Sequence, residues 1–465
     1  MAGTHLVVIG MGYVGIPCAA LFADVPGFRV TGVQRRSQRS GWKIDALNTG
    51  KSPFEGDEPG LAELIHRVVV EKRTFHVTDD ISVCRDADVI LIDVQTPVDA
   101  HKVPQYESLR EVAAAAGRYM RQGALLVIES TVAPGTTQHV VQPILERESG
   151  MKAGQDFGLA FSYERVMPGK LLEYLINFPR VVGGTDEDST RRAVELYRHI
   201  VRKEITPTEC LTAEVAKTVE NAYRDVNIAF ANEMALICES LGVDVFEVRS
   251  LVNARPDRHM HIPGAGVGGH CLPKDPWLLS HGVNSYGSTK VNSEMLTVAR
   301  RINESMPLHM AELVKEALAE AGKPLAGSRV AVLGIAYLEN SDDTRNAPAV
   351  PLIMALRDLG ANVTAHDPFV RQADFDALDF GPYLNGDVVY TQDLTEALRD
   401  ADCAVIVTKH REYLDGGLFE AVRSMENPVL VDGRGCINET ACADAGVAYW
   451  GVGKRGPGVK VLSHV

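Results

Sequence analysis

The chain has 465 residues, of which 45% are hydrophobic and 23% charged, and its formal net charge is -14. This composition is typical of a soluble globular protein with about three domains of ordinary size. The acidic balance, without a long Lys/Arg run, argues against nucleic acid or an anionic membrane as a partner, but a local basic pocket could still bind a phosphorylated small molecule. No stretch has the length and apolarity of a transmembrane helix.

The eight cysteines are scattered without Cys-x-x-Cys spacing, in a chain too large to need disulfides for its stability. This usage predicts a reducing, cytoplasmic location. We expect no metal site.

The first two hundred residues alternate apolar runs, at 6–9, 29–33, 89–94 and 125–129, with helix-like segments. Such alternation predicts a parallel sheet with crossover helices. The first run leads directly into a Gly-x-Gly-x-x-Gly loop, formed by Gly10, Met11, Gly12, Tyr13, Val14 and Gly15. The first glycine allows the tight turn, the second admits a pyrophosphate, and the third lets helix and strand pack closely. The loop therefore predicts dinucleotide binding.

The second apolar run ends at Gln34, where an Asp or Glu usually binds the adenosine ribose. Gln34 can still bond a ribose hydroxyl. The following Arg35 and Arg36 could stack on adenine, pair with a 2′-phosphate, or be solvated surface charges. NAD is the expected cofactor, and NADP stays open.

Residues 212–242 contain no proline and no internal glycine, and their apolar residues recur at intervals of three and four. This spacing predicts one long helix. Lys217 and Asn221 lie one turn apart on one face of it. They could hold a reacting oxygen between them, or they could be an ordinary surface pair.

A second alternation begins at residues 329–334 and continues through a helix at 351–359. Further strands are predicted at 362–367, 403–408 and 428–432. The fold class is therefore α/β, with two Rossmann-like parallel-sheet domains joined by a central helical segment that contains the long helix.

Residues 263–279 read Pro-Gly-Ala-Gly-Val-Gly-Gly-His-Cys271-Leu-Pro-Lys274-Asp275-Pro-Trp-Leu-Leu. Such dense glycine lets main chain approach a ligand, and a carboxylate four residues after the thiol could manage its protonation. The segment predicts a nucleophilic cysteine. The alternative is a Gly/Pro turn beside a buried structural cysteine.

Two turns, at residues 129–136 and 162–169, should follow strands of the first sheet. They contain Thr131 and Glu164. Ligands of open α/β sheets bind beyond the carboxyl ends of strands, so both turns are candidate sites, although each could be purely structural.

Together these segments resemble the nucleotide-sugar 6-dehydrogenase family over residues 5–440. Five motifs occur in the family's order, listed by their positions as Gly10 to Gly15, Gln95-Thr96-Pro97, Ser130-Thr131 with Pro134-Gly135-Thr136-Thr137, Lys217 with Asn221, and Gly268-Gly269-His270-Cys271-Leu272-Pro273-Lys274-Asp275. The segments 164–169 and 220–233 resemble the UDP-N-acetylhexosamine branch more than the UDP-glucose branch.

The resemblance implies three domains: NAD-binding at 1–205, central helical and dimerising at 206–305, and UDP-binding at 306–465. It implies that a sugar C6 alcohol is oxidised twice, through a thiohemiacetal and a thioester on Cys271. The implied catalytic residues are Cys271, Lys217, Asn221, Asp275, Glu164 and Thr131. The implied cofactor contacts are the glycine loop, Gln34, Arg35, Thr96, Thr131, Lys274 and Arg345. The implied substrate contacts are Glu164, Arg165, Val166, Lys217, Asn221, Gly264, Gly268 and Arg434, with Arg255 or Arg258 reaching the neighbouring subunit of a homodimer.

Two adjacent residues depart from the family pattern, because Tyr337-Leu338 stands where Phe-Lys is usual. Loss of that lysine puts one phosphate or hydroxyl contact in doubt. UDP-N-acetylmannosamine is the first expected substrate, ahead of UDP-glucose and the gluco and galacto N-acetylhexosamines. The competing hypotheses are a two-electron β-hydroxyacid dehydrogenase, which needs neither the cysteine loop nor a second nucleotide domain, and a decayed, non-enzymatic nucleotide-binding protein.

Overall fold

The computed structural model describes residues 3–37, 40–54, 58–381, 387–425 and 428–454. The chain forms two compact units, one from residues 1–221 and 274–292, the other from residues 222–273 and 293–465. The division at residues 205 and 305 that the family resemblance implies stays a prediction. None of the described helices is long and apolar enough to cross a membrane.

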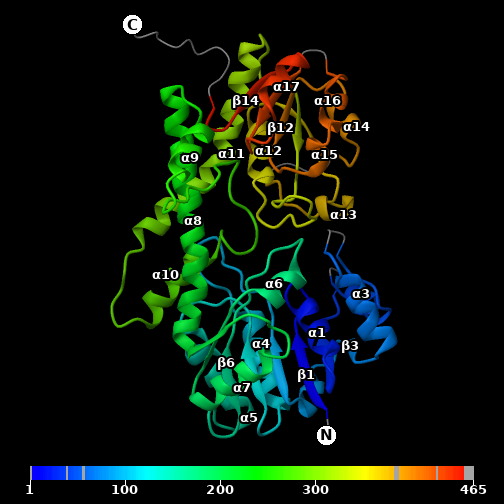
Figure 1. Cartoon of the computed structure of the whole chain (residues 1–465), viewed down its shortest axis with the longest axis vertical. Coiled ribbons are helices and arrows are strands. Elements are labelled where there is room, and N and C mark those ends of the chain that lie inside the picture. Colours follow the sequence, from blue (N-terminus) through cyan, green and yellow to red (C-terminus); the bar gives the residue numbers. More distant parts are fainter. Residues whose placement is uncertain (1–2, 38–39, 55–57, 382–386, 426–427, 455–465) are drawn as a thin grey trace. The chain divides into compact units, whose positions relative to one another are not determined.

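The first unit contains an eight-stranded sheet in the order β3-β2-β1-β4-β5-β6-β7-β8 (Figure 1, blue to green). Its strands are β1 Thr4–Ile9, β2 Phe28–Val33, β3 Phe75–Thr78, β4 Val89–Ile92, β5 Leu125–Ile128, β6 Gly158–Phe161, β7 Arg180–Gly184 and β8 Ile205–Glu209. The pairs are parallel except β6 with β7, which is antiparallel. The four strands predicted here are confirmed as β1, β2, β4 and β5, and the 3-2-1-4-5-6 core order is that of the Rossmann fold.

Helices cover both faces of this sheet. They are α1 Gly15–Asp24, α2 Trp42–Asn48, α3 Leu61–His66, α4 Glu107–Tyr119, α5 Gln142–Ser149, α6 Leu171–Asn177, α7 Glu187–Tyr197 and α10 Asp275–Tyr286, with π-helical segments at Arg67–Glu71 and Thr137–Val141 and a 3-10 helix at Ile81–Asp86. Successive residues of β1 point to opposite faces, so Leu6 and Val8 pack with α1, α3 and α7, while Val7 and Ile9 pack with α4 and α5. Burial on both faces explains why the strands read as continuous apolar runs.

The long helix α8 spans Cys210–Leu241, within two residues of the predicted range. The boundary between the two units falls inside it, after Asn221. Lys217 and Asn221 therefore belong to the first unit, together with α10.

The second unit contains a six-stranded, fully parallel sheet in the order β11-β10-β9-β12-β13-β14 (Figure 1, yellow to red). The strands are β9 Arg329–Leu333, β10 Asn362–His366, β11 Val389–Thr391, β12 Cys403–Ile406, β13 Val429–Asp432 and β14 Ala448–Gly451. The helices are α9 Val245–Asn253, α11 Glu294–Glu320, α12 Ala349–Asp358, α13 Gln372–Phe375, α14 Leu394–Leu398, α15 Arg411–Leu414, α16 Gly417–Val422 and α17 Glu439–Asp444. Counted along this unit, the strand order is again 3-2-1-4-5-6, which confirms the second Rossmann-like domain.

A buried polar chain links α11 and α8 to the glycine-rich segment of this unit. Arg300 Nη1 lies 2.7 Å from Asp225 Oδ1, and Asn303 donates to the same carboxylate oxygen at 2.8 Å. Asn232 then donates to Asn303 and accepts from the backbone N–H of Gly264, both at 2.9 Å. Because buried polar groups must be paired, this chain fixes where the segment 263–271 begins.

Candidate functional site

The glycine loop of the first unit has the geometry that a dinucleotide requires. Gly10 has φ +112°, and a Cβ there would collide with the Asp93 carbonyl oxygen. A Cβ on Gly15 would collide with the Gly10 carbonyl oxygen, whereas no atom lies within 4 Å of the Cβ position of Gly12. The loop thus leaves open space in front of Gly12 at the start of α1, and this fits a pyrophosphate at a helix N-terminus.

Gln34 is already engaged by this loop. Its Oε1 accepts from the backbone N–H of Met11 at 3.1 Å, and its Nε2 donates to Ser40 Oγ at 3.1 Å. Arg36 pairs with Asp79 at 3.2 Å and Asp45 at 3.5 Å, so it behaves as a surface charge. Gln34 therefore orders the loop itself.

Asn221, Lys274 and Asp275 meet where α8 faces the start of α10, and Lys217 lies one turn before Asn221 on α8. Asn221 Nδ2 donates to Asp275 Oδ2 at 2.5 Å, and Lys274 Nζ donates to Asp275 Oδ1 at 2.5 Å. Asp275 is fully buried, and Lys217 and Lys274 are nearly so. Lysine ammonium and amide groups in a buried site can donate hydrogen bonds to a developing oxyanion.

The turn after β6 supplies the partner of Lys217. Lys217 Nζ donates to the Glu164 carbonyl oxygen at 2.6 Å and lies 3.6 Å from Glu164 Oε1. The Glu164 carboxylate also accepts from the Val166 backbone N–H at 2.7 Å. Arg165, in contrast, is bound by Glu220 of α8, with Nε to Oε1 at 2.9 Å. The structure therefore brings Glu164 to Lys217, binds the Val166 N–H to the Glu164 carboxylate, and pairs Arg165 with a protein carboxylate.

Hydrogen bonds from several parts of the first unit hold the turn after β5. Thr96 Oγ1 donates to the Thr131 carbonyl oxygen at 2.5 Å. The Ala133 backbone N–H donates to the hydroxyl of Tyr106 at 2.9 Å. The buried Glu214 carboxylate accepts from the backbone N–H groups of Gly135 at 2.6 Å and Thr137 at 2.9 Å. We did not predict the roles of Tyr106 and Glu214 from the sequence. The available signal for Glu214 was its position three residues before Lys217 in the segment Thr-Ala-Glu214-Val-Ala-Lys217.

The cysteine segment belongs to the second unit as far as residue 273. Gly269 donates its N–H to the Arg345 carbonyl oxygen at 2.8 Å, and Asn346 Nδ2 donates to the Gly269 carbonyl oxygen at 3.0 Å. A Cβ on Gly268 would lie 2.5 Å from the Tyr337 Cβ, and one on Gly269 would lie 2.8 Å from the Tyr337 ring. These glycines are therefore required for the close approach of the loop that follows β9.

The other predicted residues of this unit fall into two groups. A Cβ on Gly264 would lie 3.0 Å from Arg434 Nη1, so these two residues are neighbours. The Arg345 guanidinium is held by the Asp343 carboxylate, with Nε to Oδ1 at 2.8 Å. Arg255 and Arg258 are exposed, lie on the loop after α9 and both pair with Asp257 at 2.7 Å, so the geometry does not separate them.

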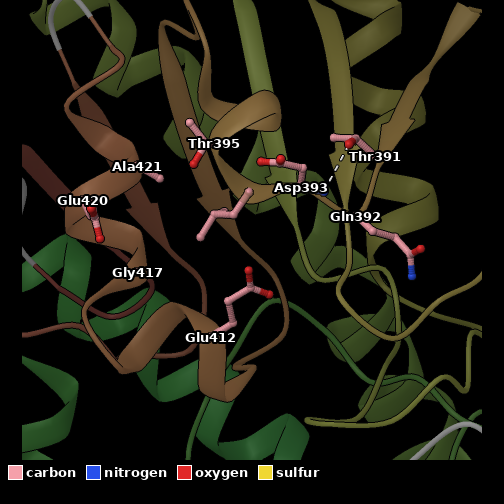
Figure 2. A pocket seen from close by; sticks show the side chains of 9 residues that line it. Thr391, Gln392, Asp393, Thr395, Glu412, Gly417, Glu420 and Ala421 are labelled. Atoms are coloured by element: carbon pink, nitrogen blue, oxygen red, sulfur yellow. Dashed lines mark hydrogen bonds between the residues drawn. The ribbon is translucent and has the colours of Figure 1, made fainter.

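A cavity of about 810 Å³ in the second unit contains no residue predicted from the sequence. It is lined by Thr391, Gln392, Asp393, Leu394, Thr395, Glu412, Gly417, Glu420 and Ala421 (Figure 2). Burial raises the pKa of Glu412, which is consistent with its place among other carboxylates. This acidic lining does not suit a nucleotide phosphate. Among the described residues, no group of three or more His, Cys, Asp or Glu side chains is placed to hold a metal ion.

Comparison with known proteins covers nearly the whole chain. Three domain descriptions of the UDP-glucose/GDP-mannose dehydrogenase family match it in order: the NAD binding domain at residues 4–201, the central domain at 211–305 and the UDP binding domain at 331–439. The chain belongs to the UDP-glucose/GDP-mannose dehydrogenase family. It is an NAD-dependent enzyme of the nucleotide-sugar dehydrogenases, and the two-electron and non-enzymatic hypotheses are set aside.

The similarity to named relatives extends over nearly the full length of both chains. UDP-N-acetyl-D-mannosamine dehydrogenase of Pyrococcus horikoshii is 36% identical over 97% of this chain and 99% of that protein. A solved structure of UDP-D-ManNAc dehydrogenase from the same organism has a TM-score of 0.85 at 35% identity, covering 97% of this chain and 99% of that one. The solved NDP-N-acetyl-D-galactosaminuronic acid dehydrogenase of Methanosarcina mazei is 40% identical with a TM-score of 0.80, covering 97% and 95%.

Proposed function

We propose that this dehydrogenase oxidises the C6 alcohol of a UDP-N-acetylhexosamine, with UDP-N-acetylmannosamine as the first candidate, to the uronic acid. The observation that carries the proposal is the group formed by Lys217, Asn221, Lys274 and Asp275. Two of its members, Lys274 and Asp275, follow Cys271 by three and four residues in the sequence. The names of the relatives support the sugar, and the sequence of residues 164–169 favours the same branch.

The protein's own groups suit two successive oxidations at one carbon. When bound, NAD accepts a hydride in each. Lys217 and Asn221 stabilise the alkoxide that develops at O6 as the alcohol loses its proton. The Cys271 thiolate then adds to the aldehyde carbon, and the adduct can lose the second hydride to become a thioester. Water hydrolyses the thioester, supplying the second carboxylate oxygen and returning the thiol, with Asp275 and Glu164 positioned to manage protons.

The other thiols are poor candidates for this role. Burial raises the pKa of each of the seven remaining cysteines, to about 11 for Cys442 and about 12 for Cys84. Cys271 is half-buried and sits beside glycines that admit a ligand. All eight cysteines are free thiols, which agrees with the proposed cytoplasmic location.

NAD is the proposed cofactor rather than NADP. Arg36 is held by Asp45 and Asp79, which leaves Arg35 as the remaining candidate for a 2′-phosphate among the two arginines that follow Gln34. A Gln at the end of β2 can donate to a ribose hydroxyl, although its oxygen already accepts from Met11.

A substrate panel tests the proposal. We expect the purified protein to release two reduced nicotinamides per UDP-N-acetylmannosamine, with a larger kcat/KM than for UDP-glucose or the gluco and galacto N-acetylhexosamines, and with NAD preferred to NADP. A preference of more than about tenfold for the galacto sugar would instead favour UDP-N-acetylgalactosamine, in line with the name of the 40% identical Methanosarcina mazei protein. Failure of every sugar to give two reduced nicotinamides would refute the proposed reaction.

A homodimer is the proposed assembly. Exposed apolar residues recur along one side of α8 at spacings of four and seven: Leu211, Val215, Val219, Tyr223, Phe230, Ile237 and Leu241. Exposed apolar patches of this length mark interaction sites, and a helix stripe is self-complementary across a two-fold axis. An arginine after α9, Arg255 or Arg258, would then complete the partner's sugar site.

Charge placed in this stripe should separate the subunits. We expect Phe230→Glu to convert a dimer to a monomer in light scattering coupled to size-exclusion chromatography, with loss of activity. Phe178→Glu, at an exposed Phe after α6, is the matched control and should stay dimeric. A wild-type protein that is monomeric at micromolar concentration, or a Phe230→Glu variant that stays dimeric, would contradict the assignment of this face.

A further inference from the structure

Glu214 is a buried carboxylate that the proposed reaction does not use. It lies on α8, one turn before Lys217, and has no exposed surface. Its two oxygens accept separately from the backbone: Oε2 from Gly135 at 2.6 Å and Oε1 from Thr137 at 2.9 Å. Both donors belong to the turn after β5, which also carries Thr131.

The same turn is where α10 packs. A Cβ on Gly282 would lie 2.6 Å from Pro134, and one on Gly135 would lie 2.8 Å from the Tyr286 ring. Tyr286 stacks on His139 with centroids 4.6 Å apart. The turn at 131–137 is therefore the place where α8, with Lys217 and Asn221, and α10, with Asp275, are both fixed to the sheet.

We propose that Glu214 is a positioning residue, which ties α8 to the turn at 131–137 in its ionised form and loosens this tie when it takes up a proton. This inference rests on the proposed roles of Lys217 and Thr131. A carboxylate can accept both N–H groups at full strength, whereas a carboxylic acid has one oxygen converted to a donor. Protonation must therefore weaken at least one of the two bonds.

The surroundings of Glu214 place this change near neutrality. Burial raises its pKa to about 7, opposed by the hydrogen bonds from Thr137 and Gly135. The titratable groups that interact with it are the Cys210 thiol on its own helix, the Tyr106 phenol before α4 and the Tyr286 phenol at the end of α10, with Arg110 beyond Tyr286. His139 lies at the same turn, stacked on Tyr286 and beside Gly135. Burial raises the pKa of the thiol and of both phenols, so these three groups are neutral across this range.

As the pH rises, the stability that Glu214 contributes and the expected kcat change in opposite directions. Because the pKa of Glu214 is higher in the folded than in the unfolded chain, its contribution to the free energy of unfolding is greatest at low pH and falls as the pH rises to about 7. The tie, in contrast, forms as the pH rises through the same range. We therefore expect kcat to increase while the stability contributed by this group decreases.

Two measurements on the whole protein test the proposal. In wild type, hydrogen exchange of the peptide containing residues 131–141, corrected for the intrinsic rate at each pH, should show protection of Gly135 and Thr137 that is lost below about pH 7. Glu214→Gln keeps one acceptor oxygen, so it should protect at most one of the two N–H groups, and this protection should not change with pH. Its kcat should be roughly 10-fold to 100-fold lower at pH 8 and flat from pH 6 to 8, with little change in KM for the sugar. Glu209→Gln, at an exposed carboxylate just before α8, is the control and should keep the wild-type profile.

The exchange measurement needs no substrate, so it separates this inference from the proposed reaction. If wild-type protection is the same at pH 6 and pH 8, the tie does not titrate and the inference is overturned, even where Glu214→Gln fails to fold. If protection changes but Glu214→Gln keeps the wild-type pH profile of kcat, Glu214 does not position the site. Lack of any sugar oxidation by wild type would refute the reaction alone.

Discussion

Cys271→Ser is expected to stop acid formation while leaving the first oxidation possible. Serine is the nearest replacement in size and shape for this half-buried side chain. Its hydroxyl is not ionised near neutral pH, however, and cannot form the adduct from which the second hydride leaves. We expect uronic acid formation to fall by roughly 10³-fold or more.

The measurement is the number of reduced nicotinamides per sugar, together with mass spectrometry of the protein and the sugar product. Cys436→Ser is the matched control, since Cys436 is the other half-buried thiol and bonds the Asp432 carboxylate. It should retain acid formation. Undiminished acid formation by Cys271→Ser would show that another group is the nucleophile.

The second large effect is expected at Lys217. Lys217→Met keeps the length of the side chain but removes the ammonium that donates to Glu164 in a nearly buried site. Removal of one preorganised donor to a developing oxyanion typically costs about 10²-fold to 10³-fold in rate, and we expect kcat to fall by that amount. KM should change much less, because the interaction strengthens in the transition state.

Steady-state kinetics with circular dichroism separates this loss from unfolding. Lys203→Met removes an exposed ammonium before β8 and should leave kcat unchanged. A folded Lys217→Met enzyme with kcat within about threefold of wild type would exclude Lys217 from the chemistry. A larger effect on KM than on kcat would instead assign Lys217 to ground-state binding.

The sequence predicted those parts of the molecule whose signals are local. The strand at 6–9, the glycine loop and the helix at 212–242 follow from apolar runs, Gly spacing and the 3.6-residue period. They appear as β1, the start of α1 and α8. The parallel sheets follow from the alternation of strands and helices.

Partners that are distant along the chain could not be predicted in this way. Glu214 accepts a hydrogen bond from Gly135, which is 79 residues away in the sequence. The spacing of apolar residues in α8 does not predict which side of the helix faces that turn. Tyr337 was noted as a departure from the family pattern, but its place against Gly268 and Gly269 depends on how β9 meets the cysteine segment. Gln34 was expected to face a ribose, yet it also orders Met11, because the loop folds back over the end of β2.

The polar chain from α11 to the segment before Cys271 limits how this protein can diverge. Arg300, Asp225, Asn303 and Asn232 are each almost completely buried, and each bonds the next. Replacing one of them leaves a buried polar group on its neighbour without a partner, so a single substitution is costly unless a neighbouring position changes with it. Sequence drift at these four positions should therefore be concerted rather than independent, and homologues should differ there by whole sets.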